Sequence, residues 1–198
     1  MTTGSIESRI EALESQLNAR DERIKELEAR VQELEDVREI NDVMRRWHYA
    51  CTGGFNGIPA HRAREALDLL TDDATIELQM LHDKGTGPTG TEALFEYLRQ
   101  FEGDDGKLPQ VFQTGSDYRV EVHGDTAVQR SNIVTLAQGE VTGGRAQMGT
   151  SRYVNEFVRA PEGWKIKKIS LVSALNAPFQ EQVRSAQIRP GSGWTSGE

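Results

Sequence analysis

Hydrophobic residues recur at alternating intervals of three and four through the first 36 residues, where no glycine or proline lies between Ser5 and Asp36. In heptad notation these apolar residues take positions a and d, and Arg20 is the exception. A single helix cannot bury two apolar seams by itself, so the pattern predicts a coiled coil over residues 1–36. Position a holds Ile10, Leu17, Ile24 and Val31, and position d holds Ile6, Leu13, Leu27 and Leu34.

The charged residues beside this seam indicate how the helices would pair. Arg23 and Arg30 fall at position g, and Glu28 and Glu35 fall at the following e positions. Pairing from g of one helix to e of the next is typical of parallel coiled coils, so we predict parallel self-association as a dimer or trimer. The alternative is a single solvated helix with ion pairs between residues four apart.

From residue 37 the apolar spacing becomes that of a helix with one buried face, which ends at the glycine pair 53–54. A second short helix is expected over residues 61–70. A third is expected over residues 91–101, with Thr91 as its N-cap. The buried face of the first helix consists of Val37, Ile40, Met44, Trp47 and Cys51.

Strands dominate the rest of the chain. A first strand before the third helix carries Ile76, Leu78 and Met80 on one face, and four long strands follow Pro109. Helices followed by a run of antiparallel strands predict an α+β domain over residues 37–180, with the helices covering one face of a curved sheet. The glycine-rich and polar residues 181–198 are predicted to be disordered.

Composition narrows the function classes. The chain has 198 residues and a net charge of −8, and no basic stripe that could neutralise phosphates, so we expect neither nucleic-acid nor membrane partners. One cysteine excludes an internal disulfide framework and fits a reducing compartment. The charged N-terminus does not resemble a signal peptide, and no apolar run reaches membrane-spanning length, so a cytoplasmic location is expected.

Five stretches together resemble the SnoaL-like branch of the NTF2-like superfamily, over positions 37 to 178. They are "VREINDVMRRW", "ALDLLTDDATIEL", "GPTGTEALFEYL", "VEVHGDTAVQRSNIVT" and "SRYVNEFVRAPEGWKIKKI". The resemblance implies a cone-shaped α+β barrel with an apolar pocket between the sheet and the helices. Members include dehydratases, dehydrochlorinases, isomerases, polyketide cyclases and proteins that only bind, so the fold alone does not define the function.

In dehydratase-like members, an aspartate of the first helix and a histidine near the start of the long third strand share the proton transfer. The resemblance places the aspartate position at Thr52 and the histidine position at Gln113, and a tyrosine position five residues before the aspartate falls on Trp47. A hydroxyl and an amide can orient a substrate, but neither is a useful base near neutral pH. The Asp–His dyad is therefore absent.

Histidines and a tyrosine are the candidates to replace the dyad. His48 shares a helix face with Thr52, which the resemblance places near the pocket mouth; the alternative is a histidine at the edge of the core. His82 follows the inward parity of its strand if the strand extends that far, and Tyr153 is the best inward phenol. The alternatives are a strand that ends before His82 and an ordinary core role for Tyr153. His61 and His123 are expected to be solvated, and Cys51 to be a buried structural thiol.

The alternation of side chains along the strands predicts the remaining pocket residues. Arg130 and Asn132 share parity with Val134 on a face that the resemblance assigns to the pocket, where Arg130 would hold a carboxylate or a developing oxyanion. The alternative is an arginine that reaches solvent at the end of the sheet. The apolar and small residues expected to complete the wall are Ile76, Leu78, Leu171 and Ser173.

Together these residues predict a lyase or isomerase that moves a proton on a hydrophobic, aromatic or polycyclic small molecule, by elimination, dehydration or retro-aldol-type cleavage. The predicted catalytic residues are His48, His82, Tyr153 and Arg130. No cofactor or metal is expected, because the four histidines are scattered and "GTGPTG" fits no phosphate-binding fingerprint. The alternatives are a binding protein without catalysis and an adaptor that acts through its coiled coil.

Overall fold

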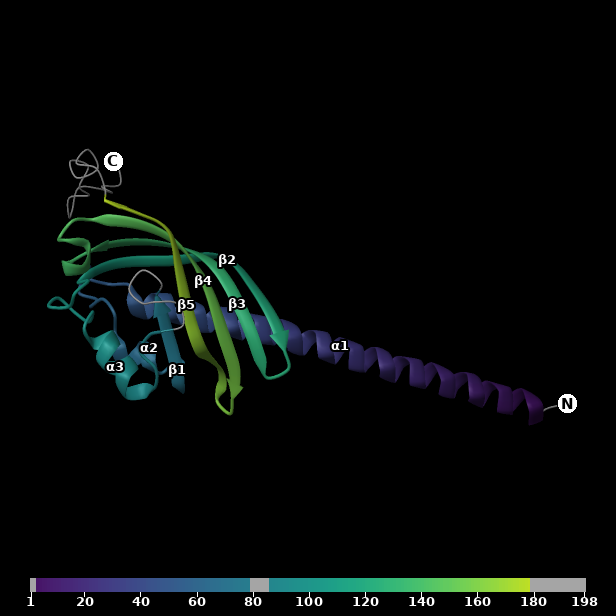
Figure 1. The fold of residues 1–198 in the computed structure, drawn as a ribbon. Coiled ribbons are helices and arrows are strands. Elements are labelled where there is room, and N and C mark those ends of the chain that lie inside the picture. The colour runs from purple at the N-terminus through teal and green to yellow at the C-terminus, as the bar shows by residue number, and fades with distance from the viewer. Residues whose placement is uncertain (1–2, 79–85, 179–198) are drawn as a thin grey trace, which may run out of the picture.

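The computed structural model describes residues 3–78 and 86–178, with side chains described from residue 8 to residue 172. A single helix, α1 (Thr3–Cys51), runs through the expected domain boundary at residue 36 without a break. Only its last turns lie against the sheet, and its N-terminal part projects away from the rest of the molecule (Figure 1). The predicted disordered segment 181–198 lies outside the described residues.

Two different faces of α1 carry apolar residues. The described residues of the heptad seam are exposed, with Leu34 at 69% and Val31 at 53%, whereas Ile40 and Met44 are completely buried in the domain. At about 100° per residue, the buried face lies on nearly the opposite side of the helix from the seam. The domain therefore leaves the described seam residues, Ile10 to Leu34, uncovered.

Five strands form one curved sheet in the order β1-β5-β4-β3-β2 (Figure 1). Their bounds are β1 Leu70–Leu78, β2 Gln110–His123, β3 Thr126–Gln138, β4 Gln147–Ala160 and β5 Gly163–Pro178. Strands β2 to β5 form the expected antiparallel meander. The edge strand β1 instead runs parallel to β5, because the chain leaves β1 through α3 and enters the sheet again at the opposite edge.

Two short helices join the end of α1 on the concave side of the sheet: α2 (Ala63–Leu67) and α3 (Thr91–Arg99) (Figure 1). The expectation that Thr91 caps α3 is wrong. The N-cap is Gly90, whose φ of 85° favours glycine, and the Thr91 hydroxyl donates to the Asp72 carbonyl at 3.2 Å. The core fills the space between these helices and the sheet, so the predicted α+β class and layer arrangement are confirmed.

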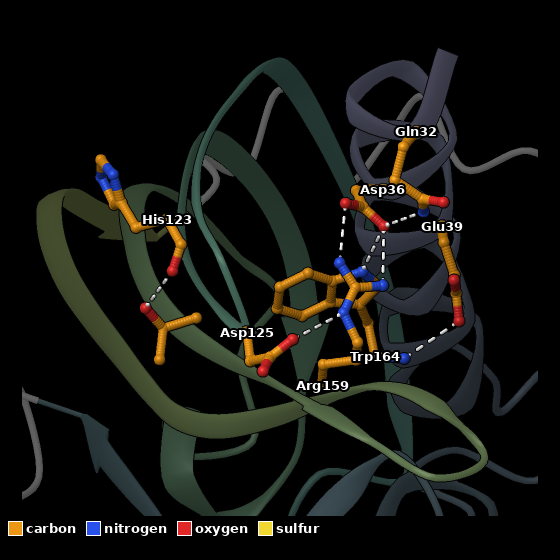
Figure 2. A network of polar contacts seen from close by, with 8 residues as sticks. Gln32, Asp36, Glu39, His123, Asp125, Arg159 and Trp164 are labelled. Atoms are coloured by element: carbon orange, nitrogen blue, oxygen red, sulfur yellow. Dashed lines mark hydrogen bonds and ion pairs between the residues drawn. The ribbon is translucent and has the colours of Figure 1, made fainter. Parts of the chain in front are cut away.

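A buried carboxylate ties α1 to the sheet (Figure 2). Asp36 accepts two hydrogen bonds from the Arg159 guanidinium, at 2.9 and 2.8 Å, and one from the Trp164 indole at 3.1 Å. One turn further along α1, the Glu39 carboxylate accepts the Trp164 backbone N–H at 2.9 Å. The Arg159 guanidinium holds the pKa of Asp36 below its usual value. These contacts hold α1 to β4 and β5 at the point where the helix enters the domain, before the residues Trp47 and Cys51 that line the cavity.

Candidate functional site

A cavity of about 500 Å³ lies between the concave face of the sheet and the helices. This volume is sufficient for a small organic molecule of several rings. Among the described residues, the wall contains no charged side chain, and no three metal-binding side chains come together anywhere. The wall consists of Trp47, Cys51, His61, Ile76, Leu78, Tyr97, Leu98, Phe101, Leu108, Val111, Gln113, Thr135, Ala137, Val141, Thr142, Gln147, Gly149, Ser151, Tyr153 and Leu171.

The phenol of Tyr153 is the best-defined polar group of this wall. Its oxygen accepts hydrogen bonds from the Trp47 indole N–H and the Gln113 amide, both at 3.4 Å. A phenol oxygen that already receives two donors has its own hydrogen left to donate elsewhere. Burial raises the pKa of Tyr153, so the hydroxyl stays protonated. Tyr153 can therefore donate a hydrogen bond to an oxygen of a bound molecule.

Gln113 connects Tyr153 to His48, in the last turn of α1, and to Thr52, the residue that follows the helix. Its side-chain oxygen lies 3.2 Å from His48 Nδ1, which assigns the hydrogen of the neutral imidazole to that nitrogen. Its backbone N–H donates to the Thr52 hydroxyl at 3.0 Å, and that hydroxyl donates to the Gln113 carbonyl at 3.2 Å. Thr52 and Gln113, to which the resemblance assigns the dyad positions, thus form hydrogen bonds between the end of α1 and β2. We name Trp47, His48, Gln113 and Tyr153 the Tyr153 cluster.

His48 is buried but does not line the cavity. Its ring stacks on that of Tyr153 at 5.7 Å between centroids, and a Cβ on Gly115 of β2 would lie 2.8 Å from its Nε2. Nε2 has no hydrogen-bond partner among the described residues. Burial lowers the pKa of His48, partly offset by the Gln113 bond, so the ring is neutral near pH 7. His48 reaches the cavity only through Gln113 and Tyr153.

The predicted inward parity on β3 is wrong. Arg130 pairs with Glu121 at 2.8 Å on the outer face, and Asn132 and Val134 are exposed beside it. The inward residues are instead the buried Ala127, Gln129, Ser131 and Ile133 and, at the cavity, Thr135. Alternation along β3 predicted the wrong inward face because the exposed outer face carries the apolar Val134 and Leu136, whereas the buried inner face carries the polar Gln129 and Ser131. The apolar outer residues include Phe112, Val134, Leu136 and Met148.

Most other predicted wall residues lie at the cavity: Trp47, Gln113, Ile76, Leu78, Tyr153 and Leu171. Thr52 is not among the wall residues, and its hydroxyl hydrogen-bonds to the backbone of Gln113. Ser173 pairs through its backbone with Ser151, and its side chain lies outside the described residues, as does the whole of His82. Cys51 is buried, and its burial raises the thiol pKa to about 12, which suits the structural role expected for it.

Sequence reasoning missed His61, which was expected to be solvated. It follows α1 in a loop, with a φ of 51°, and its backbone N–H donates to the Cys51 carbonyl at 3.3 Å. Its ring lies in the cavity wall, 5.5 Å from the Phe101 ring. Burial, with a smaller contribution from Arg62, lowers the pKa of His61 to about 4. The loop sequence "IPAHR" has no periodicity that could have indicated an inward side chain.

A curved sheet with helices packed over its concave face and a cavity between them is the NTF2-like arrangement of a small α+β domain. Within that class, the chain belongs to the SnoaL-like family, because the profile of the SnoaL-like domain matches residues 32–170. The resemblance derived from the sequence is thereby confirmed. A comparison with curated proteins finds no match. No described helix has the combination of length and apolar composition that crossing a bilayer requires.

Three solved structures with the same fold are similar to the chain at low sequence identity. A putative aromatic ring hydroxylase from Novosphingobium aromaticivorans shares 21% identity and a TM-score of 0.61, over 75% of this chain and 96% of that one. A putative scytalone dehydratase from the same organism shares 17% and 0.60, over 75% and 90%. A hexachlorocyclohexane dehydrochlorinase from Novosphingobium barchaimii shares 16% and 0.60, over 75% and 93%.

Proposed function

We propose that this protein is a cofactor-independent lyase or isomerase that moves a proton on a hydrophobic, aromatic or polycyclic small molecule held in the cavity. The observation that carries the proposal is the Tyr153 hydroxyl, which is buried in an uncharged, mostly apolar wall and accepts two hydrogen bonds, so that its hydrogen is available. A fixed donor in a water-poor cavity stabilises negative charge that develops on a carbonyl or leaving oxygen. Dehydratases and dehydrochlorinases among the structural neighbours support the same class of chemistry.

Each residue of the Tyr153 cluster has a distinct role in this proposal. Tyr153 holds the substrate oxygen, Gln113 and Trp47 aim the phenol, and His48 fixes the orientation of the Gln113 amide. The proton acceptor is an imidazole, because no carboxylate belongs to the described wall. His61 is an imidazole of the described wall, but its pKa of about 4 makes it a weak base near pH 7. The candidates for the acceptor therefore stay His48, which contacts Gln113, and His82, which lies outside the described residues.

A thermal-shift screen followed by product analysis tests the proposal. We expect uncharged aromatic and polycyclic compounds to raise the melting temperature, and at least one of them to be converted without added cofactor, as shown by mass spectrometry. The hits are incubated with the wild-type protein and with Tyr153→Phe. Conversion by the wild type alone supports the proposal, whereas intact recovery of every hit would contradict it.

One observation favours a second function, the binding of a small molecule without catalysis. Thr52 and Gln113, at the positions that the resemblance assigns to the usual dyad, have side chains that cannot act as bases. The Thr52 hydroxyl both accepts a hydrogen bond from the backbone N–H of Gln113 and donates one to its carbonyl. A protein that retained the fold and lost the chemistry would look like this. Intact recovery of a tightly bound hit from the screen would indicate this function.

We further propose that α1 joins copies of this chain in a parallel coiled coil. The described apolar a and d residues are exposed on the helix face opposite the domain, so a second helix can pack on them without displacing any described contact. Burying such a seam stabilises the associated form by about 25 cal/mol for each Å² of apolar surface that is removed from water. The domains of the partners would then lie outside the coiled coil.

Replacing Leu27, a seam residue that is 44% exposed, by lysine is expected to weaken self-association at least ~10-fold, because a charge enters the apolar interface. Sedimentation equilibrium measures this against the monomer mass of 22.1 kDa. Ala29→Lys is the matched control, since position 29 faces away from the seam, and its association is expected to equal that of the wild type. A wild-type protein that stays monomeric at concentrations on the order of 100 micromolar would contradict the coiled coil.

A further inference from the structure

The charged residues beside the heptad seam of α1 are separated by sign into two columns. From residue 9 to residue 35, the e positions hold only carboxylates, and the g positions hold arginine with one exception, Gln16. The e residues are Glu14, Asp21, Glu28 and Glu35, and the g residues are Arg9, Gln16, Arg23 and Arg30. An acidic column on one side of the seam and a basic column on the other are complementary to a second copy of the same helix.

The two columns also select the orientation of that second copy. In a parallel pair, each g residue lies beside the e residue five positions further along the facing helix, so the g arginines meet carboxylates. In an antiparallel pair, g faces g and e faces e, so like charges would meet along both sides of the seam. The charges of α1 therefore favour parallel pairing of identical chains.

The exception in the basic column coincides with the exception in the apolar seam. Gln16 would face Asp21 of the second copy, and an amide cannot neutralise a carboxylate. Arg20 of the same heptad occupies position d, where the other described seam residues are apolar. In a parallel pair, a d side chain packs into a hole that includes the e residue of the facing helix. The Arg20 stem can therefore lie in the seam while its guanidinium reaches Asp21 of the second copy.

The described part of a single chain offers Arg20 no such partner. No acidic residue lies three or four positions from Arg20, and Arg23, three positions further on, has the same charge. Arg23 and Lys25 form ion pairs within α1, whereas Arg20 and Asp21 form none among the described residues. Both side chains are exposed, on the part of the helix that projects away from the domain (Figure 1).

We propose, building on the proposed coiled coil, that two copies of α1 pair in parallel and in register, and that Arg20 of each copy forms an ion pair with Asp21 of the other. Three of the four a residues from Ile10 to Val31 are β-branched and the apolar d residues from Leu13 onward are leucine, a combination that favours two strands. The two ion pairs lie on opposite sides of the seam. In register, both arginines share one layer of the seam, whereas a shift by one heptad places each against leucine and disrupts two layers.

A double-mutant cycle on the full chain tests the ion pair. The dimerisation constants of the wild type, Asp21→Arg, Arg20→Glu and the double variant are measured by sedimentation equilibrium, and we expect the wild type at twice the monomer mass of 22.1 kDa. Each single change places like charges together twice in the dimer, so we expect it to weaken association at least ~10-fold. The double variant restores opposite charges, and we expect it to associate at least ~10-fold more tightly than additive single effects would give.

Glu22→Arg is the matched control for the change in charge. It makes the same substitution of a cation for a carboxylate one residue away, at position f, which faces solvent in a coiled coil. We expect its dimerisation constant to lie within ~2-fold of the wild-type value. Far-UV circular dichroism establishes that every variant is folded.

Disulfide formation tests the orientation and the register. In Ile10→Cys, the new thiols occupy facing a positions only if the helices are parallel and in register, and we expect oxidation to link two chains covalently on a non-reducing gel. The wild type is the control, because its single cysteine, Cys51, is buried in the domain. We expect no covalent dimer from it.

Additive effects of the two single changes would overturn the ion pair. A mass of three chains would overturn the two-stranded pairing, and a dimer that Ile10→Cys does not link would overturn the parallel register. Each of these results leaves the association of copies through α1 in place. A wild type that stays monomeric at concentrations on the order of 100 micromolar would overturn the coiled coil and this pairing together. The proposed lyase or isomerase activity is tested separately, since none of these readouts involves the cavity.

Discussion

Replacing Tyr153 by phenylalanine is expected to lower kcat for the substrate found by the screen about 100-fold, with little change in KM. The variant loses one hydroxyl and keeps the ring that stacks on His48. Removal of a single fixed donor from a developing oxyanion typically costs 10²–10³-fold in kcat. The donor acts mainly on the transition state, where the oxygen carries the most charge, so the loss falls on kcat rather than on substrate binding.

The phenol of Tyr97 provides a matched control for this experiment. Tyr97 also lines the cavity, but it comes from α3 and does not belong to the Tyr153 cluster. We expect Tyr97→Phe to change kcat less than ~3-fold, which separates loss of the specific donor from loss of any cavity hydroxyl. Equal effects of the two substitutions, or a Tyr153→Phe enzyme with wild-type kcat, would show that Tyr153 does not stabilise the developing charge.

The fold was predictable from the sequence because helices and strands have different apolar periods. The spacing from Val37 to Cys51 located the buried face of α1, and the four long strands after Pro109 gave the meander. The parallel pairing of β1 with β5 could not be read in this way, since it depends on a contact between strands about 90 residues apart in the sequence. Periodicity reports which face of an element is buried and carries no information on its distant neighbour.

The candidate site was harder to predict, for two physical reasons. Parity on β3 fails where the outer face is apolar and the inner face holds Gln129 and Ser131, so hydropathy assigned Arg130 to the wrong side. His61 sits in a loop, where backbone turns rather than a regular period decide which way a side chain points. Trp47, Gln113 and Tyr153 were found because they lie on regular elements, the first two at positions indicated by the family resemblance and Tyr153 by strand parity.

Replacing Asp36 by alanine is expected to lower the free energy of unfolding by about 2–3 kcal/mol at pH 7. Asp36 is 3% exposed and accepts hydrogen bonds from Arg159, Trp164 and Gln32 (Figure 2). Alanine leaves the indole N–H of the buried Trp164 without its acceptor. Chemical denaturation with urea, followed by tryptophan fluorescence, measures the change. Asp125→Ala is the control, because it removes an exposed partner of the same arginine and should cost less than ~1 kcal/mol.

The pH dependence of this difference separates a carboxylate effect from a general packing effect. The pKa of Asp36 is lowered in the folded protein, mainly by Arg159, so its ionised form stabilises the fold above the unfolded value of 3.8. That contribution is lost as the pH falls from 3.8 through the folded pKa, because the carboxyl of the unfolded chain binds a proton more readily than that of the folded protein. The stability gap between the wild type and Asp36→Ala should therefore be constant from pH 7 to about 5 and narrow below pH 4. A gap that is independent of pH down to pH 3 would mean that α1 is held to the sheet by packing around residue 36 and not by the charge of its carboxylate.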